Sequence, residues 1–153
     1  MSTGLRLAPA SPSLPEARRL ISALDDYLAS LYPGPSNHLL DVAALEQPGV
    51  SFYLGWLGDK AVACGAIVAH AGYVELKRMY VDPQHRGQGI ARALLAALEA
   101  TARETGKVLA RLETGIHQAE AIALYRTCGF AERTPFGSYA ADPLSLFMEK
   151  PLE

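Results

Sequence analysis

The chain has 153 residues, of which half are apolar and a fifth are charged, and its formal net charge is −2. This length and composition predict a soluble globular protein with a single domain over residues 1–153. The near-neutral charge, without a basic block, argues against non-specific nucleic-acid binding. The longest apolar stretch, residues 61–72, is too short to cross a membrane, and the N-terminus lacks the apolar core of a signal peptide. We therefore expect a cytoplasmic protein without a membrane partner.

The cysteines and histidines give no sign of a metal or disulfide framework. Cys64 and Cys128 are the two cysteines, too few for a disulfide scaffold or a zinc site. Buried thiols in a reducing compartment are the simpler interpretation. The four histidines are scattered without paired spacing, so we expect no metal site.

The N-terminal part predicts one strand and two helices. Residues 5–8 form a short first strand. A stretch rich in Ser and Pro then starts an amphipathic helix that runs to about Leu31. The following Tyr-Pro-Gly-Pro breaks it. Asn37 with its preceding serine offers an N-cap for a short second helix that ends near Glu46.

Three strands are predicted next. Residues 50–56 alternate between apolar and small or polar side chains, which indicates a strand. Gly58 and Asp59 form a hairpin turn. Residues 61–70 are almost continuously apolar and predict a strand buried on both faces. After a turn, residues 73–81 form the third strand.

The C-terminal part alternates helices and strands. A helix over about 88–105 ends at Gly106, and Gly129 closes a second helix. The order along the chain is β-α-α-β-β-β-α-β-α-β-β. It predicts a mixed α/β fold, a central mixed sheet flanked by helices, with antiparallel hairpins and one β-α-β crossover. The other segments expected here are a strand over 108–113, the second helix over 117–128, and final strands over 130–134 and 144–150.

The loop between the third strand and the next helix is the most informative segment. It contains Gly87 and Gly89, and an amphipathic helix follows directly. Glycines allow the backbone to curl and expose successive N–H groups. At a helix N-terminus those groups and the helix dipole favour an anion. The segment therefore predicts a binding site for a pyrophosphate.

Two familiar pyrophosphate-binding loops fit this segment poorly. A P-loop requires a Lys after its second glycine, and none is present. A dinucleotide-binding Gly-x-Gly-x-x-Gly loop would have Arg92 in place of its third glycine. Glu113 does end the next strand, where a ribose-binding acid belongs. A dinucleotide-binding oxidoreductase thus remains a weaker alternative.

A third comparison accounts for more of the chain. The loop Gln84-His-Arg-Gly-Gln-Gly89 resembles the Gln/Arg-x-x-Gly-x-Gly/Ala loop of the GNAT superfamily of acetyl-CoA-dependent N-acetyltransferases. Residues 121–130, Ala-Ile-Ala-Leu-Tyr-Arg-Thr-Cys-Gly-Phe, resemble that family's Ala-x-x-Leu-Tyr-x-x-x-Gly-Phe helix ending. The order of elements is also similar. The resemblance implies the GNAT fold, acetyl-CoA as co-substrate and an amine acceptor, and it is compatible with a homodimer.

The resemblance implies a set of cofactor-binding residues. The CoA pyrophosphate would bind backbone N–H groups of the loop, and the pantetheine arm would pair with the preceding strand. Gln118 stands where the family often has an Asn that contacts the pantetheine. For the side chains of Arg86 and Arg92, solvated surface cations are an equally good interpretation. The implied residues are Met79, Tyr80, Val81, Arg86, Gly87, Gln88, Gly89, Ile90, Ala91 and Gln118.

Two residues are candidates for acid–base chemistry. Tyr125 could protonate the leaving thiolate, or it could be a core tyrosine packed over Phe130. Glu75 could take the proton of the acceptor ammonium, or it could form a structural pair with Lys77. Strict alternation predicts one face carrying Glu75, Lys77, Met79 and Val81, and the opposite face carrying Leu76, Arg78 and Tyr80.

The acceptor site is predicted to be small, polar and aromatic, with Lys77 near its centre. Because it shows no acidic cluster, an amine that also bears a carboxylate, such as an amino acid or a peptide end, fits better than a polycation. An acyl-CoA-binding module without turnover is the remaining alternative. The walls would come from Tyr32, Ser36, Asn37, His38, Phe136 and Tyr139.

Overall fold

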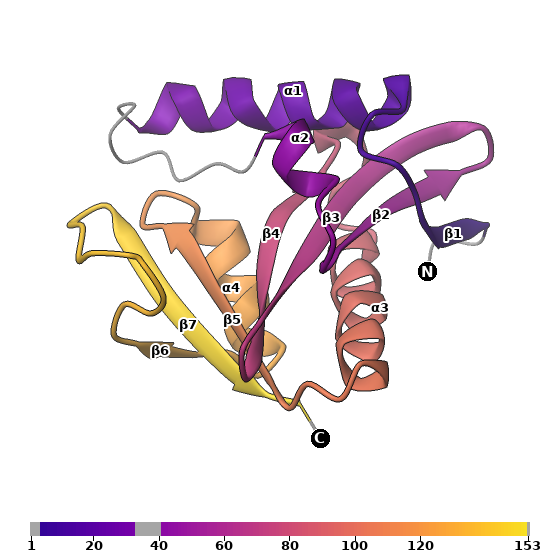
Figure 1. Ribbon diagram of the computed structural model, residues 1–153. Coiled ribbons are helices and arrows are strands. Elements are labelled where there is room, and N and C mark those ends of the chain that lie inside the picture. Colours follow the sequence, from indigo (N-terminus) through magenta and orange to yellow (C-terminus); the bar gives the residue numbers. More distant parts are fainter. Residues whose placement is uncertain (1–3, 33–40, 153) are drawn as a thin grey trace.

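The computed structural model describes residues 4–32 and 41–152, which form one seven-stranded sheet with helices on both faces (Figure 1). The strand order is β1-β2-β3-β4-β5-β7-β6, and every neighbouring pair is antiparallel except β4–β5. This mixed sheet confirms the predicted fold class and differs from the doubly wound parallel sheet of a dinucleotide-binding domain. The strands are β1 (Leu5–Pro9), β2 (Val50–Leu57), β3 (Lys60–His70), β4 (Tyr73–Val81), β5 (Leu109–Gly115), β6 (Ala131–Arg133) and β7 (Ser145–Pro151).

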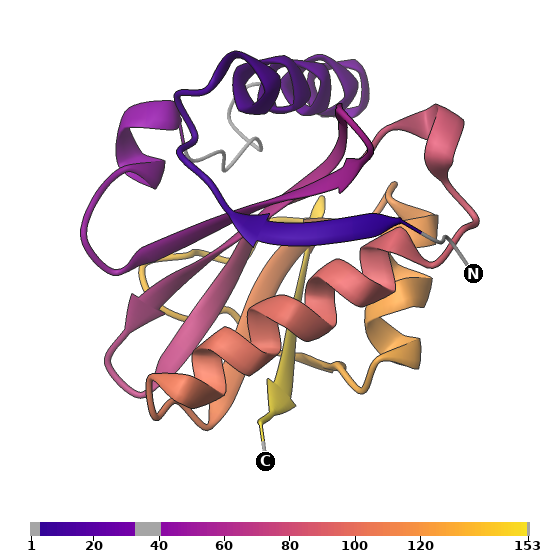
Figure 2. The same ribbon diagram turned by 90° about the vertical axis from the view of Figure 1, so that its right-hand side faces the viewer.

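The helices cover opposite faces of the sheet (Figures 1 and 2). On one face, α3 and α4 pack over a core that includes Leu94, Leu98 and Leu112. On the other face, α1 and α2 pack over a second core around Leu20 and Leu54. The sheet therefore separates two hydrophobic cores. The helices are α1 (Pro15–Leu31), α2 (Val42–Leu45), α3 (Ile90–Glu104) and α4 (Ala119–Thr127), and a 3₁₀ turn, η2 (Pro83–His85), precedes α3.

Two helix starts differ from the sequence prediction. The described α2 begins at Val42, and the Asp41 side chain accepts a hydrogen bond from the Ala44 N–H; the predicted cap, Asn37, lies outside the described residues. Helix α3 begins at Ile90 rather than at 88, because Gly89 adopts a left-handed conformation with φ 78°. Glycine adopts such a φ without steric cost, and this left-handed conformation prevents the α-helix from starting before Ile90.

A β-bulge in β4 changes which side chains share a face. Ala66 pairs with Lys77 and Cys64 pairs with Tyr80, so two residues of β4 lie opposite Gly65. Arg78, the first of these two, has a φ of 60°. An extra residue of this kind reverses the alternation beyond it.

The predicted face assignment is therefore wrong beyond Lys77. Met79 packs with the α3 side of the sheet, where a Cβ on Gly65 would lie 2.6 Å from the Met79 sulfur. Arg78 instead pairs with Asp25 of α1, and Tyr80 packs against the α1 core. Glu75 and Met79 thus lie on opposite faces.

The two parallel strands separate halfway along their length. The register of β4 and β5 runs from Val74↔Ala110 to Leu76↔Leu112 and ends there. Both strands continue beyond this row, β4 to Val81 and β5 to Gly115, and Figure 1 shows them diverging. The divergence leaves backbone groups of β4 without a neighbouring strand on that side.

Candidate active site

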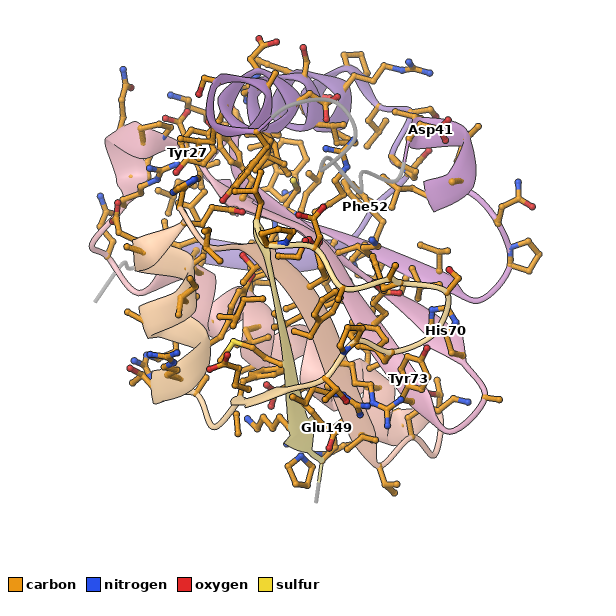
Figure 3. The ribbon with its side chains drawn as sticks, turned by 90° about the vertical axis from the view of Figure 1, so that its left-hand side faces the viewer. Tyr27, Asp41, Phe52, His70, Tyr73 and Glu149 are labelled. Carbon is orange, nitrogen blue, oxygen red and sulfur yellow. The ribbon has the colours of Figure 1, made fainter. Side chains whose placement is uncertain are left out.

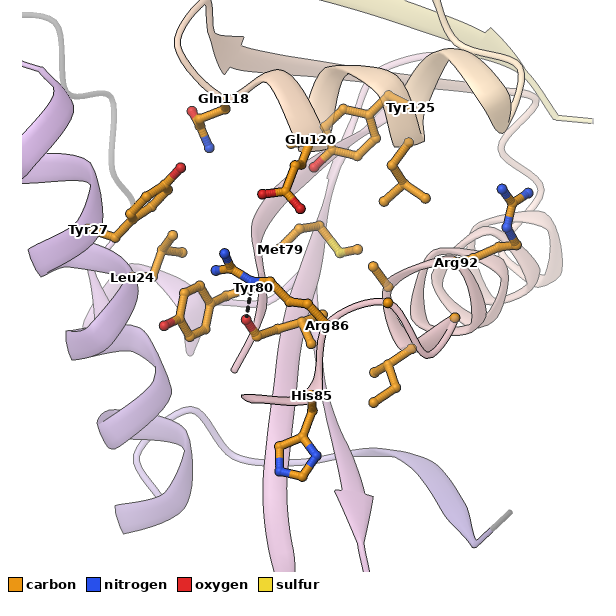
Figure 4. Close-up of a pocket in the computed structure, with 17 residues that line it drawn as sticks. Leu24, Tyr27, Met79, Tyr80, His85, Arg86, Arg92, Gln118, Glu120 and Tyr125 are labelled. Atoms are coloured by element: carbon orange, nitrogen blue, oxygen red, sulfur yellow. Dashed lines mark hydrogen bonds between the residues drawn. The ribbon is translucent and has the colours of Figure 1, made fainter. Parts of the chain in front are cut away.

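A pocket of about 430 Å³ lies where β4 ends, between α1, the loop before α3, and α4 (Figure 4). Its walls thus come from segments about 100 residues apart in the sequence. Nine of the ten residues that the sequence predicted for the cofactor are among its lining, and Gln88 is the exception. The full lining is Leu24, Tyr27, Met79, Tyr80, Val81, His85, Arg86, Gly87, Gly89, Ile90, Ala91, Arg92, Gln118, Glu120, Ala121, Leu124 and Tyr125.

The loop end of the pocket fits an anion. Gly87 and Gly89 have φ values of 76° and 78°, and the space where their Cβ atoms would stand is open to 4 Å. No side chain caps α3, so its first-turn N–H groups have no internal partner. Backbone donors at a helix N-terminus bind phosphate groups. A pyrophosphate therefore fits this end of the pocket.

Arg86 forms part of the pocket wall. Its guanidinium Cζ lies 5.9 Å from the ring centroid of Tyr27 and 5.8 Å from that of Tyr80. Its Nε donates a hydrogen bond of 3.1 Å to the Val81 carbonyl, the bond dashed in Figure 4. These contacts hold the guanidinium at the pocket wall, although the residue as a whole is exposed.

Tyr125 presents its hydroxyl to the pocket (Figure 4). The residue is 6 % exposed, and its ring makes an edge contact with Phe130 at 5.8 Å. Within residues 4–32 and 41–152 the hydroxyl has no hydrogen-bond partner. Burial raises the pKa of Tyr125 well above its usual value. The phenol is thus protonated at neutral pH and can donate a hydrogen bond.

Gln118 is oriented by the loop between β5 and α4. Its Oε1 accepts hydrogen bonds from the Gly115 N–H at 3.0 Å and from Tyr32 at 3.5 Å. The Tyr32 oxygen also accepts from the His117 N–H, and a Cβ on Gly115 would lie 1.8 Å from that oxygen. Because the carbonyl of the Gln118 amide is engaged, its NH₂ group is the end available to the pocket. Tyr32 is buried in this contact.

Glu75 lies in a cluster on the opposite face of the sheet from α3. The residue is 5 % exposed, and Oε1 lies 3.2 Å from His70 Nε2. Oε2 accepts a hydrogen bond from the Tyr139 hydroxyl and lies 3.3 Å from Lys77 Nζ. The Glu75–Lys77 pair of the structural interpretation is therefore present. Figure 3 shows His70 beside Tyr73, and their rings stack at 4.8 Å.

Of the predicted acceptor residues, Tyr32 contacts Gln118 and His117, and the others fall into two groups. Lys77, Tyr139 and Phe136 come together, because the Phe136 and Tyr139 rings are in edge contact at 5.3 Å and Lys77 donates to the Tyr139 oxygen. Burial and the hydrogen bond to Glu75 raise the pKa of Tyr139. Ser36, Asn37 and His38 lie outside the described residues.

Several pocket residues escaped the sequence analysis. Leu24 and Tyr27 come from α1, and Glu120 and Leu124 from α4. The apolar pattern of α1 indicated a buried face, and that pattern alone could not tell a core from a pocket wall. Leu24 and Tyr27 line the pocket because α1 lies next to the loop before α3 in the folded protein.

Comparisons with known proteins agree with this geometry. The model of the acetyltransferase (GNAT) family matches residues 17–130. The chain belongs to the GNAT acetyltransferase family. This N-acetyltransferase is 50 % identical to the IAA acetyltransferase of Azospirillum brasilense over 148 residues, which cover 95 % of this chain and 97 % of the relative.

Solved structures show the same fold. A Klebsiella pneumoniae protein proposed to be an acyl-CoA N-acyltransferase superposes with a TM-score of 0.83 at 43 % identity, covering 97 % of this chain and 98 % of that one. The PaiA N-acetyltransferase of Thermoplasma acidophilum, solved with coenzyme A, gives a TM-score of 0.76 at 16 % identity over 99 % of both chains. At that identity the second match supports the fold alone.

Membrane-spanning helices and metal-binding clusters are both absent from the part of the chain that the structure describes. Within it, no helix has the length and apolar character needed to span a bilayer. No group of three or more His, Cys, Asp or Glu side chains within the same residues could hold a metal ion.

Proposed function

We propose that this GNAT enzyme transfers an acetyl group from acetyl-CoA to a primary amine of a small molecule or peptide, by direct attack in a ternary complex. The observation that carries the proposal is the pocket, which joins the uncapped N-terminus of α3 to the buried hydroxyl of Tyr125. Bound there, acetyl-CoA would supply the activated acetyl group.

Different residues of the pocket bind different parts of acetyl-CoA. Backbone N–H groups between Arg86 and Ala91 hold the pyrophosphate. The end of β4, from Met79 to Val81, and the NH₂ group of Gln118 hold the pantetheine arm. Tyr125 donates a proton or a hydrogen bond to the departing thiolate, because its phenol stays protonated at neutral pH.

Direct transfer is favoured over a covalent acyl-enzyme. Cys64 is fully buried, and burial raises the pKa of its thiol to about 12. A nucleophilic cysteine needs a thiolate, so Cys64 is unsuited to that role. The acceptor nitrogen must instead be deprotonated before it attacks, and a carboxylate near the opening between β4 and β5 suits this step. Glu75, the residue predicted from the sequence, and Glu113 are the two candidates.

The acceptor side favours an amine that also carries a negative charge. Lys77 is a cation of this region, and its ammonium is held by Glu75 and Tyr139. We expect amino acids or peptide ends to be acetylated faster than spermidine or kanamycin, because their carboxylate can face this cation.

A thiol-release assay with acetyl-CoA tests the activity, using alanine, alanyl-alanine, spermidine and kanamycin as acceptors. Calorimetry measures acetyl-CoA binding in parallel. Release of CoA that depends on an added amine supports the enzyme. Binding without turnover for any amine would indicate a binding module, and no binding at all would contradict the pocket assignment. A preference for the polycations would refute only the expectation that the acceptor amine also carries a carboxylate.

A further inference from the structure

A buried ion pair joins α3 to β7, and no step of the proposed acetyl transfer uses it. Glu99 of α3 is 6 % exposed, and its two carboxylate oxygens accept hydrogen bonds of 2.8 and 3.1 Å from Lys150 Nζ. Arg103 lies 3.5 Å from the same carboxylate, but it is exposed. Taking two charges out of water carries a desolvation penalty that can exceed their mutual attraction. The pair therefore need not add stability, and the other contacts of Lys150 indicate a second role.

Lys150 also supports the end of α4. Its aliphatic stem lies against the turn that follows the helix, because a Cβ on Gly129 would lie 3.4 Å from Lys150 Cε. Its ammonium lies 5.9 Å from the ring centroid of Phe130, within the range of a cation–π contact. Figure 2 shows the end of β7 between α3 and α4, where Lys150 can contact both.

Phe130 connects this support to Tyr125. The two rings are in edge contact at 5.8 Å, and the Phe130 N–H donates a hydrogen bond of 2.9 Å to the Tyr125 carbonyl. Both the ring and the backbone of Tyr125 are therefore held by the residue that Lys150 supports. Among the described residues of α4, Tyr125 alone is buried. The position of its side chain thus depends strongly on the contacts at this end of the helix.

We propose that Lys150 and Glu99 are positioning residues which, through Phe130, fix the hydroxyl of Tyr125 where the departing thiolate forms. This rests on the proposed acetyl transfer, in which Tyr125 is the general acid. Glu99 holds the ammonium of Lys150, and Lys150 holds Phe130 and the turn before it. No proton moves to or from either residue in the reaction. Because a misplacement of about 1 Å can lower a rate on the order of 10²-fold, a loosened Phe130 should reduce kcat.

The first test compares Lys150→Met with Lys150→Arg and with the control Arg103→Met. Methionine keeps an apolar stem but lacks the ammonium, so we expect kcat with alanyl-alanine to fall on the order of 10-fold, with the KM for acetyl-CoA unchanged. Arginine keeps the charge and can still bond to Glu99, so Lys150→Arg should retain most of the wild-type kcat. Arg103→Met removes the other cation beside Glu99, leaves the Lys150–Phe130 contact in place, and should stay near wild type.

A double-mutant cycle separates positioning from a purely structural role. In the Tyr125→Phe background the hydroxyl is absent, so adding Lys150→Met should lower kcat no further. A purely structural pair would lower the melting temperature in both backgrounds and leave the kcat of the folded enzyme unchanged in each. Glu99→Gln keeps the shape of its side chain and runs through the same cycle in a milder form. It decides the question if Lys150→Met does not fold.

The outcomes distinguish this inference from the proposed function. Calorimetry should show wild-type acetyl-CoA affinity for Lys150→Met, which reports a folded cofactor pocket. The positioning role is overturned by wild-type kcat in the folded Lys150→Met and Glu99→Gln enzymes, by an equal loss in Arg103→Met, or by losses that multiply with that of Tyr125→Phe. A wild-type enzyme that acetylates no amine would overturn the proposed function and the positioning role with it.

Discussion

Tyr125 keeps a buried hydroxyl without a hydrogen-bond partner among the described residues. A buried polar group left unsatisfied costs about 1–3 kcal/mol. At a core position a phenylalanine would avoid that cost while keeping the contact with Phe130. The hydroxyl instead faces the pocket, where the sulfur of the co-substrate could satisfy it.

We expect Tyr125→Phe to lower kcat on the order of 10²-fold with little change in the KM for acetyl-CoA, because only the proton donor is removed. Steady-state kinetics with a good acceptor measure the effect. Tyr53→Phe is the matched control: its hydroxyl bonds to Thr101 of α3, away from the pocket. It should leave kcat unchanged. A Tyr125→Phe enzyme with wild-type kcat would exclude the general-acid role.

Gly89 tests the phosphate end of the pocket. Gly89→Asp adds a side chain and a negative charge in the open space before α3, so we expect acetyl-CoA affinity to fall at least tenfold, about 1.4 kcal/mol. Gly72→Asp is the control, because Gly72 also has a positive φ, 85°, and open space around it but lies in the β3–β4 turn. Calorimetry on both variants separates backbone strain from the pocket. Equal affinities would refute the anion site.

At the scale of elements, the bulge in β4 decides the architecture of the site. Because of the bulge, the Met79 side chain faces α3 and the Arg78 side chain faces α1. The φ of 60° at Arg78 is costly for a residue other than glycine, so surrounding contacts must hold it. The Arg78 side chain is 4 % exposed and its guanidinium pairs with Asp25, which is 43 % exposed. The Cys64 thiol donates to the Arg78 carbonyl.

We expect Asp25→Asn to lower the free energy of unfolding by about 1–2 kcal/mol, because it weakens the charge-assisted hydrogen bond to a buried guanidinium. Urea denaturation measures the change. Asp26→Asn is the matched control, since Asp26 is the exposed neighbour on the same helix, and its effect should lie within about 0.5 kcal/mol. If the two variants were equally stable, the ion pair would have no part in holding the bulge.

At the scale of the whole molecule, the cofactor pocket depends on the assembled tertiary structure. Its walls come from α1, β4, the α3 loop and α4, so it exists only when these segments are folded together. A ligand that binds the folded state alone stabilises it by mass action. Ligand-induced stabilisation is therefore a direct measure of whether the assembled pocket recognises acetyl-CoA.

At a concentration of 100 times its Kd, acetyl-CoA should stabilise the protein by about 2.7 kcal/mol. For a chain of this size the melting temperature should rise by about 5–10 °C. NAD at the same concentration should give no shift, because the sheet lacks the dinucleotide-binding topology. Differential scanning fluorimetry compares the two ligands. A shift with NAD and none with acetyl-CoA would reverse the assignment of the pocket.

The sequence by itself determined the elements and the local chemistry of the cofactor site. Apolar periodicity, caps and turn residues predicted the strands and α-helices of the described residues in the right order, but not the 3₁₀ turn η2. The glycines of the α3 loop and the Tyr125 helix ending indicated the pocket. These signals could be read because they are local: a turn that needs φ above zero, a helix N-terminus and an alternating pattern each occupy a few consecutive residues.

Only the tertiary structure decided which faces of the strands and helices contact one another. The bulge opposite Gly65 reversed the alternation that had joined Glu75 to Met79, and packing of α1 made Tyr27 a pocket wall. Glu113 came to the opening because β5 and β4 stop pairing one row earlier. Such features depend on contacts between segments far apart in the chain, where close packing and ion pairs outweigh local periodicity.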